Sequence, residues 1–411
     1  MARAAVALGV MLILNSSVPA GSAAQAVIGG QWRNDVADFA QRIVDAGLTP
    51  GAGVAVAVGD WVAWVEGFGS VDLDTQRPVT DDTPFYIASS TKALTATAAM
   101  VAVHKGDLDL DAPMVHYLPD ARLPEGVEPT SITVRDLIGL THGLSGNGPI
   151  VLRTAYTGEF TRHQLLALLR YHEPTGDHGT FDYNNLGYNL LGMVLESVYQ
   201  DSWKEIVNRL VLEPLGMTST SAYRSRLDPD RLALPHDFGA GGFTAIPLAK
   251  RDENLHAAGG HFASARDLAR FLAVHQSGGS LDGEQVLPRE VVAATHRLHA
   301  TQDRDFGPFH RFGWGYGWDL GTYDGDTLIH RFGGFPGYRS HMSFMPEHQI
   351  GVVVLVNGDG PASPAADLLA TYIYDRLLDK PDLEARYAAR LDSLVRRAGE
   401  IRRRVAEHLE E

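Results

Sequence analysis

The chain contains no cysteine among its 411 residues. This absence excludes disulfides, thiolate nucleophiles, cysteine-ligated zinc or iron–sulfur sites, and a lipid anchor on an N-terminal cysteine. Positive charge is also scarce, because 35 Lys and Arg stand against 50 Asp and Glu and leave a formal net charge of −15. Nucleic acid is therefore not an expected partner, since binding it needs clustered positive charge. Any covalent nucleophile must be an oxygen or a nitrogen.

Several familiar catalytic motifs are missing as well. Beyond the N-terminal segment there is no Gly-x-Ser-x-Gly pentapeptide, no His-Glu-x-x-His, no Gly-x-x-x-x-Gly-Lys and no dinucleotide fingerprint after a strand. The 17 His are scattered without the spacing of metal ligands. We therefore expect neither a metal nor a cofactor.

Long apolar runs are confined to the N-terminus. Arg3 is followed by an apolar stretch over residues 4–14 and a small-residue segment over 19–26, which is the build of a cleaved secretory signal. The alternative, a membrane-spanning helix, needs roughly 20 apolar residues. We predict a signal peptide over residues 1–26, a secreted or periplasmic protein, and no membrane span in the mature chain.

Hydrophobic residues make up 45% of the chain, enough for a large core. Apolar periodicity predicts a helix over 34–46 and a hairpin of strands over 53–58 and 61–67, joined by Gly59-Asp60. Strands over 340–345 and 350–357 and a helix over 362–378 follow near the other end, whereas the middle reads as helix and loop, including helices over 133–139, 162–170, 186–199 and 265–275.

These patterns predict an α+β fold in which both chain ends build one antiparallel sheet flanked by helices, with a mostly helical region inserted between them. The expected ranges are 27–105 and 291–379 for the two parts of the α/β domain and 106–290 for the helical domain. Residues 380–411 are rich in Arg and Glu with apolar residues at helical spacing. They predict an amphipathic helix docked on the body, with self-association as the alternative. The sequence does not give an oligomeric state.

One candidate nucleophile is Ser89, which precedes Lys92 by three residues at the start of a run of helix formers. Positions i and i+3 share a helix face, so the Lys92 amine can reach the Ser89 hydroxyl. The helix N-terminus favours an alkoxide, and burial can lower the pKa of a lysine by a few units from about 10.4. The structural alternative is that Ser89 caps the helix and Lys92 is solvated.

A second polar element is Tyr183-Asn184-Asn185, directly before the helix expected over 186–199. A Tyr and an Asn two apart on a loop point to the same side. Tyr183 offers a phenol that can relay a proton, and Asn185 offers an amide that can hold a substrate carbonyl. The alternative is that Tyr183 packs and Asn185 caps the helix.

The third element covers residues 330–338 and includes Arg331, Gly333 and Gly334, just before a strand. Glycines let a ligand lie against the backbone and accept hydrogen bonds from N–H groups, while a neighbouring cation can hold a carboxylate. The alternative is a glycine-rich turn.

In this order the three elements resemble the active-site triplet of the serine β-lactamase and penicillin-binding-protein superfamily, whose first element is Ser-x-x-Lys. The nearest likeness is to the class C β-lactamase-like branch, which includes D-alanyl-D-alanine carboxypeptidase-like enzymes and β-lactamase-like esterases. It extends over about residues 35–378 and includes the segments 85–95, 106–111, 132–137, 181–192, 214–217, 258–260 with Ser264 and 267–268, and 333–340.

The resemblance implies a β-lactamase-like fold and a role for each residue. Ser89 would be the acylated nucleophile, Lys92 its base, Tyr183 the proton relay and Asn185 the substrate-orienting amide. The backbone N–H groups of Ser89 and Gly334 would form the oxyanion hole.

Two departures from the family pattern stand out. The third element usually reads Lys or His, any residue, Gly, and counting back from Gly333 places Arg331 at the cation position. His330 would lie on the opposite face of a strand, unless a bulge shifts the register. An Arg can clamp a substrate carboxylate but cannot act as an acid or base. In addition, the family's Leu-x-His-x-Ser-Gly-Leu stretch is replaced by residues 137–144, which we expect to alter a loop.

The resemblance thus predicts an exported serine hydrolase acting through an acyl-enzyme on a small carboxylic ester or a D-amino-acid peptide or amide. The alternatives are a β-lactamase and a non-catalytic, penicillin-binding-like protein that interacts with peptidoglycan.

Overall fold

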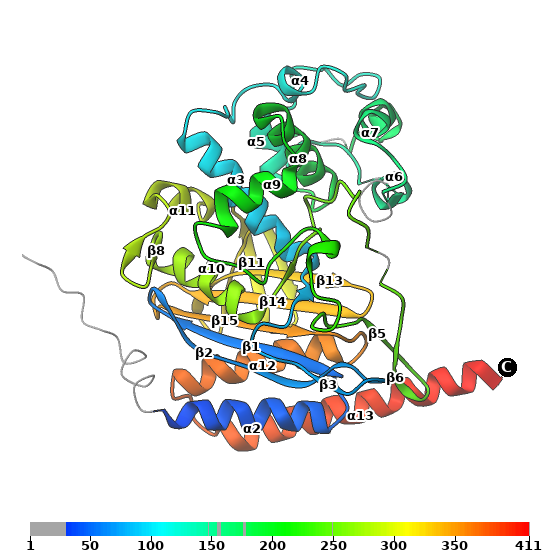
Figure 1. Ribbon diagram of the computed structural model, residues 1–411, viewed down its shortest axis with the longest axis vertical. Coiled ribbons are helices and arrows are strands. Elements are labelled where there is room, and N and C mark those ends of the chain that lie inside the picture. The colour runs from blue at the N-terminus through cyan, green and yellow to red at the C-terminus, as the bar shows by residue number, and fades with distance from the viewer. Residues whose placement is uncertain (1–29, 147, 154–157, 176–177, 249, 411) are drawn as a thin grey trace, which may run out of the picture.

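The computed structural model describes residues 30–146, 148–153, 158–175, 178–248 and 250–410. The predicted signal peptide lies outside these residues. The dominant element is a nine-stranded sheet in the order β10-β11-β12-β13-β14-β15-β1-β2-β3, in which every neighbouring pair is antiparallel (Figure 1). Its strands are β1 (Gly51–Val58), β2 (Trp61–Asp72), β3 (Arg77–Pro78), β10 (Ala300–Phe306), β11 (Phe309–Trp314), β12 (Asp319–Tyr323), β13 (Asp326–Phe335), β14 (Tyr338–Met345) and β15 (Ile350–Val356).

Both ends of the chain build this sheet. β1 lies between β2 and β15, and its register on β15 runs from Ala52 opposite Val356 to Val58 opposite Ile350. The predicted α+β fold with a sheet from both chain ends is therefore confirmed. The predicted strands all form, and each extends slightly beyond or stops slightly short of its expected bounds.

Helices cover both faces of the sheet. One face packs against α12 (Ala362–Leu377) and α2 (Gln31–Asp45), and the other packs against α10 (Ala265–Ser277). Alternate strand residues enter different cores: Val354 faces the α12 side, whereas Val353 faces the α10 side. The helix α10, which the sequence assigned to the helical range 106–290, thus belongs to the layer on the sheet.

The inserted region lies above the α10 face (Figure 1). Its central helix is α3 (Thr91–His104), which the sequence assigned to the α/β range 27–105. Small and apolar residues lie on every face of α3, so it is buried along most of its length. The other helices are α4 (Met114–Tyr117), α5 (Val134–Gly139), α6 (Gly148–Leu152), α7 (Arg162–Leu168), α8 (Leu186–Tyr199), α9 (Trp203–Val207) and α11 (Arg289–Thr295). Short strands β4 (Phe85–Tyr86) and β7 (Phe262–Ala263) pair beside α3, and β5 (His236–Gly239) with β6 (Gly242–Ala245) and β8 (Ser280–Leu281) with β9 (Glu284–Gln285) form two small hairpins.

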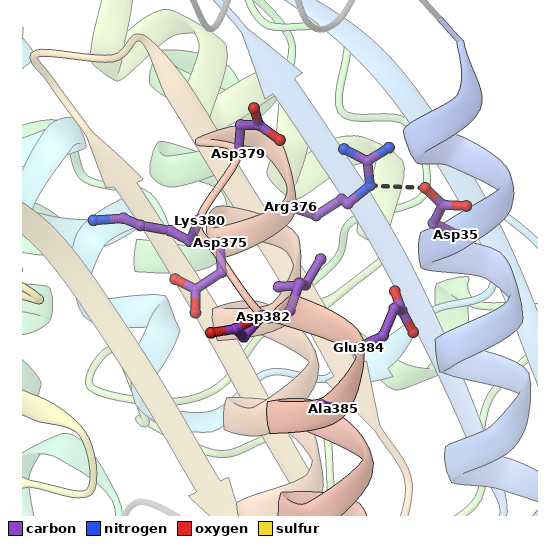
Figure 2. Close-up of a pocket in the computed structure, with 9 residues that line it drawn as sticks. Asp35, Asp375, Arg376, Asp379, Lys380, Asp382, Glu384 and Ala385 are labelled. Atoms are coloured by element: carbon purple, nitrogen blue, oxygen red, sulfur yellow. Dashed lines mark hydrogen bonds and ion pairs between the residues drawn. The ribbon is translucent and has the colours of Figure 1, made fainter.

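The C-terminal helix α13 (Leu383–Glu410) docks on α12 through buried Tyr387 and Leu391, as the amphipathic pattern predicts. A hollow of about 630 Å³ lies where α2, α12 and α13 meet (Figure 2). Two of its acidic residues are paired within the protein: Arg376 Nε donates to Asp35 at 2.7 Å and Arg386 to Asp375 at 2.7 Å. The described residues hold no cluster of three or more acidic or histidine side chains arranged for a metal ion. No helix among them combines the length and the apolar character that crossing a membrane requires.

Candidate active site

Ser89 lies at the junction of the sheet and the helical region, in a tight 3₁₀ turn over Ala88–Ser90. The α-helix α3 starts only at Thr91, two residues later than the sequence predicts. Ala88 has φ 45°, a left-handed conformation that costs energy for a residue with a Cβ. From Thr83 to Met100 every residue is buried except Ser89. The turn therefore presents one hydroxyl from an otherwise closed segment.

Two serines fix this turn to the sheet. Ser90 Oγ donates to the carbonyl of Arg331 on β13 (3.1 Å), and Ser340 Oγ on β14 donates to the carbonyl of Ile87 (2.8 Å). Gly333 permits the close approach, because a Cβ there would lie 2.0 Å from the Ile87 carbonyl oxygen. The predicted glycine element thus supports the nucleophile turn from beneath.

Lys92 points from the first turn of α3 toward Ser89 and is fully buried. Its Nζ lies 3.3 Å from Ser89 Oγ, 2.7 Å from Asn185 Oδ1 and 3.0 Å from the carbonyl oxygen of Ala258. Burial lowers the pKa of Lys92 below its ordinary value, and the charge of Arg331 lowers it further, whereas Tyr183 and Asp319 raise it. The alternative of a solvated Lys92 is therefore wrong.

Tyr183 approaches from the loop before α8. Its ring centroid lies 5.0 Å from Lys92 Nζ, and its hydroxyl oxygen is buried with no partner in full hydrogen-bond geometry. Burial alone would raise the pKa of Tyr183, but the positive charges of Arg331 and Lys92 and the nearby Ser89 hydroxyl bring it down to about 8. A phenol with this pKa can exchange a proton near neutral pH.

Asn185 turns its side chain into the site, because its Oδ1 accepts from Lys92. It does not cap α8 with its side chain. That task falls to Asn184, whose Oδ1 accepts from the backbone N–H of Leu186 at 3.0 Å and contacts His142 Nε2 at 3.2 Å. The capping alternative for Asn185 is thus wrong, and the substrate-orienting role stays a prediction for its Nδ2.

The register of β13 on β14 is continuous from Ile329 to Phe335, so no bulge exchanges the two candidate cations. Arg331 faces the active-site side, with its guanidinium carbon 4.9 Å from the Tyr183 ring centroid. His330 faces the opposite side and is fully buried, with its ring centroid 4.3 Å from that of Phe332. The period-two argument for Arg331 therefore gives the correct face.

The surroundings of Arg331 differ from the sequence expectation of a substrate-binding cation. The side chain is only 5% exposed, and its Nη1 lies 3.1 Å from Oδ2 of Asp319 on β12. Gly334 is exposed, and no atom lies within 4 Å of where its Cβ would be. The backbone of Gly334 is thus open to solvent on its Cβ side, and the oxyanion hole formed by the N–H groups of Ser89 and Gly334 stays a prediction.

Sequence reasoning missed several residues of the site. Asp319 and Ser340 are buried polar residues within strands, and Ala258 contributes only its carbonyl. A charge such as that of Asp319 between Trp318 and Leu320 is the kind of signal that points to a buried ion pair. A backbone carbonyl such as that of Ala258 cannot be recognised from the sequence, because every residue has one.

Comparisons with known proteins identify a family and a shared fold. The family model for Beta-lactamase matches residues 36–373. Penicillin-binding protein 4 of Amycolatopsis lactamdurans is 28% identical over 324 residues, covering 78% of this chain and 84% of that protein. Protein flp of Staphylococcus aureus (strain NCTC 8325 / PS 47) is 23% identical over 318 residues, which cover 76% of this chain, but the match spans only 60% of that protein.

Solved structures share the fold. The octameric penicillin-binding protein homologue from Pyrococcus abyssi superposes with a TM-score of 0.70 at 26% identity, covering 86% of this chain and 78% of that one. The D-amino acid amidase from Ochrobactrum anthropi SV3 (TM-score 0.68, 21% identity, 84% and 98% coverage) and EstCE1, a hydrolase with promiscuous acyltransferase activity (0.69, 22%, 87% and 98%), show the fold alone. The chain belongs to the beta-lactamase family, whose model spans most of its length.

Proposed function

We propose that this protein is an exported serine hydrolase that cleaves a carboxylic ester or a D-amino-acid amide or peptide through an acyl-enzyme on Ser89. The names of its relatives and neighbours support this class, since they include a penicillin-binding protein, an amidase and a hydrolase with acyltransferase activity. Export rests on the predicted signal peptide.

The observation that carries the proposal is the arrangement around Lys92 Nζ. An uncharged amine has two N–H groups and one lone pair. The carbonyl of Ala258 and Oδ1 of Asn185 are acceptors only, so they engage the two N–H groups. In that uncharged state the third direction, toward Ser89 Oγ, is left to the lone pair. A charged ammonium would donate to all three oxygens, so it is the burial of Lys92, which lowers its pKa, that favours the form able to accept the serine proton.

Acylation follows from these positions. Ser89 Oγ attacks the substrate carbonyl carbon while its proton passes to Lys92 or, through the buried phenol, to Tyr183. The carbonyl oxygen becomes an oxyanion beside the backbone N–H groups of Ser89 and Gly334. Each such donor is worth about 3 to 4 kcal/mol of barrier. Collapse of this intermediate breaks the bond to the leaving group, which takes the proton back from Tyr183.

Deacylation reverses the proton path. A water molecule attacks the acyl carbon and gives its proton to Tyr183 or Lys92. The bond between the acyl carbon and Ser89 Oγ then breaks, and the serine oxygen regains a proton from the same pair. The products are the carboxylic acid and the free enzyme, so no other reactant is needed.

A fluorophosphonate probe tests the chemistry directly. The expected result is a single adduct on the peptide that contains Ser89, lost in Ser89→Ala and strongly slowed in Lys92→Met. Ser343→Ala is the matched control, because Ser343 is fully buried and its Oγ contacts His341 Nε2 instead of the Ser89 turn. No adduct on the folded wild-type protein would favour a non-catalytic protein of the same fold, and an adduct that survives Ser89→Ala would contradict the proposal.

Four substrates compared in parallel address the reaction class. We expect p-nitrophenyl butyrate or a D-amino-acid amide to turn over faster than nitrocefin, with a D-Ala-D-Ala peptide as the fourth arm. Fast, sustained nitrocefin hydrolysis that depends on Ser89 would instead assign the protein as a β-lactamase.

A further inference from the structure

We propose that Asp319 is a positioning and specificity-determining residue: it holds the Arg331 guanidinium against Tyr183 and away from substrate, so that the site selects acyl groups without a free carboxylate. This inference rests on the proposed function and narrows its substrate class.

Asp319 is a fixed, buried carboxylate. It is 1% exposed, and its Oδ1 accepts a hydrogen bond from Gln302 Nε2 on β10 at 3.0 Å. Its Oδ2 lies 3.1 Å from Arg331 Nη1 and 3.4 Å from Arg311 Nη2 on β11. One carboxylate therefore meets two buried cations, each at most 5% exposed, and breaking such a contact leaves an uncompensated charge inside the protein.

The same contacts fix the direction of Arg331. Its Nε donates to the carbonyl of Phe332 at 3.1 Å, while Nη1 reaches Asp319. The guanidinium carbon lies 4.9 Å from the ring centroid of Tyr183 and 5.3 Å from that of Trp314. Arginine stacks on aromatic faces in this way. The group that could clamp a substrate carboxylate bidentately is thus held by a carboxylate of the protein.

Charged and titratable groups face Tyr183 from several elements. Lys92 comes from α3, Ser89 from the 3₁₀ turn, Arg331 from β13, Arg311 from β11 and Tyr188 from α8, with Asp319 behind Arg331. Asp319 raises the pKa of Lys92 and pairs with Arg331, so its charge should also offset part of the positive charge that acts on the phenol. Replacing this carboxylate with a neutral amide should favour the phenolate and move the activity profile toward acid.

Substrate choice follows from the same balance. A substrate carboxylate that approaches Arg331 must compete with Asp319, which is already desolvated and in place. Like charges brought close together in a buried site repel strongly. An uncharged acyl group meets no such competition.

The test compares p-nitrophenyl butyrate with p-nitrophenyl hemisuccinate, which adds a carboxylate to a short acyl chain. In Asp319→Asn we expect the ratio of kcat/KM for the hemisuccinate over the butyrate to rise by about tenfold or more, mainly through a lower KM. The double variant Asp319→Asn with Arg331→Met should lose this gain. The pH midpoint of butyrate hydrolysis should fall by about 0.5 to 1 unit in Asp319→Asn. A purely structural role would leave that midpoint unchanged.

An unchanged ratio in folded Asp319→Asn, or an equal rise in the double variant, would overturn the inference. Succinate binding measured by calorimetry gives a readout without turnover: Ser89→Ala with Asp319→Asn should bind it, whereas Ser89→Ala alone should not. Butyrate hydrolysis that persists in Ser89→Ala contradicts the proposed function, while the succinate titration still decides the role of Asp319. If Asp319→Asn does not fold, the double variant Asp319→Asn with Arg311→Met removes one of the two buried cations as well. The kcat/KM ratio and the pH midpoint are then measured in this double variant.

Discussion

Each face of the large sheet carries a serine hydroxyl beside a nitrogen base. On the α10 side, Ser89 lies 3.3 Å from Lys92. On the α12 side, Ser343 contacts His341 Nε2 at 2.7 Å, and His341 Nδ1 lies 2.9 Å from Asp367. The second set has the Ser-His-Asp order of many hydrolases and the shorter contacts.

Access separates the two sets. Ser343 and His341 are fully buried in the layer between the sheet and α12, and the Tyr374 hydroxyl occupies the other side of Ser343 at 2.9 Å. Ser89 is partly exposed, with the open backbone of Gly334 beside it. Hydrogen-bond geometry alone therefore does not define a catalytic site, because a carbonyl must also reach the hydroxyl and find donors for its oxygen.

Replacing each of the two serines by alanine tests the difference between the two sets and has the largest expected effect. Ser89→Ala should lower kcat/KM for p-nitrophenyl butyrate by about 10⁴-fold or more, because no other hydroxyl can accept the acyl group. Ser343→Ala should leave kcat/KM within about twofold and lower the free energy of unfolding by about 1 kcal/mol, the worth of a buried hydrogen bond. Ester kinetics and urea unfolding measure the two quantities. Comparable activity losses in both variants would refute the distinction.

The two tyrosines give the next largest contrast. Tyr183→Phe removes the proton relay and should lower kcat by about 10²- to 10³-fold. In the wild type, activity should rise with pH through the Tyr183 pKa of about 8, because deprotonation makes the phenol a base. This rise of activity with pH should disappear in Tyr183→Phe, whereas Tyr374→Phe should keep the pH–activity profile of the wild type. A rise that persists in Tyr183→Phe would assign it to another group.

The neighbouring residues Gly333 and Gly334 allow a comparison within the active-site face of the sheet. Gly333→Ala should push the Ser89 turn away from β13 and cost about 1 to 3 kcal/mol of stability, with a further loss in kcat, because its Cβ meets the Ile87 carbonyl. Gly334→Ala keeps its N–H and meets open space, so its stability should stay within about 0.5 kcal/mol of wild type. Thermal unfolding and ester kinetics of both variants test this, and equal destabilisation would contradict it.

The smallest expected effect is the pH dependence of the free energy of unfolding that comes from His341 in the buried Ser343-His341-Asp367 set. Burial lowers the pKa of His341 in the folded protein, although Asp367 raises it in part. The folded state then binds fewer protons than the unfolded state, so this contribution to stability is lost as pH falls below the unfolded value of about 6.5. The stability difference between wild type and His341→Gln should narrow from pH 7 to pH 5, by at most about 1.4 kcal/mol per unit. Urea unfolding of both proteins at pH 7 and at pH 5 measures this narrowing.

Much of the fold could be predicted because local patterns agree with tertiary structure. The hairpin around Gly59-Asp60 and the alternation in β15 each bury a defined face, and the helix over 186–199 has the predicted bounds. The helix start at Ser89 was missed, since the 3₁₀ turn depends on support from Ser340, which is distant in sequence.

The residues of the candidate site could be predicted only where their types and spacing form a recognisable motif in the sequence. The approach of Lys92 to Ser89 matches the expectation from spacing. The position of Tyr183 and Asn185 beside the same amine follows from the family resemblance and not from spacing. The pairing of Arg331 with Asp319 could not be predicted, because it depends on the register between β12 and β13. A single Asp within a strand does not indicate which cation it pairs with.

The attachment of the Ser89 turn has a consequence for biosynthesis. Its supporting contacts to Arg331 and Ser340 span 241 and 250 residues of sequence from Ser90. Closing such long loops is slow, and these contacts can form only after the last strands have left the ribosome. A chain truncated before β13 would carry the nucleophile and its lysine yet lack the platform that orients them. Hydrolytic competence should therefore arise only in the completed polypeptide.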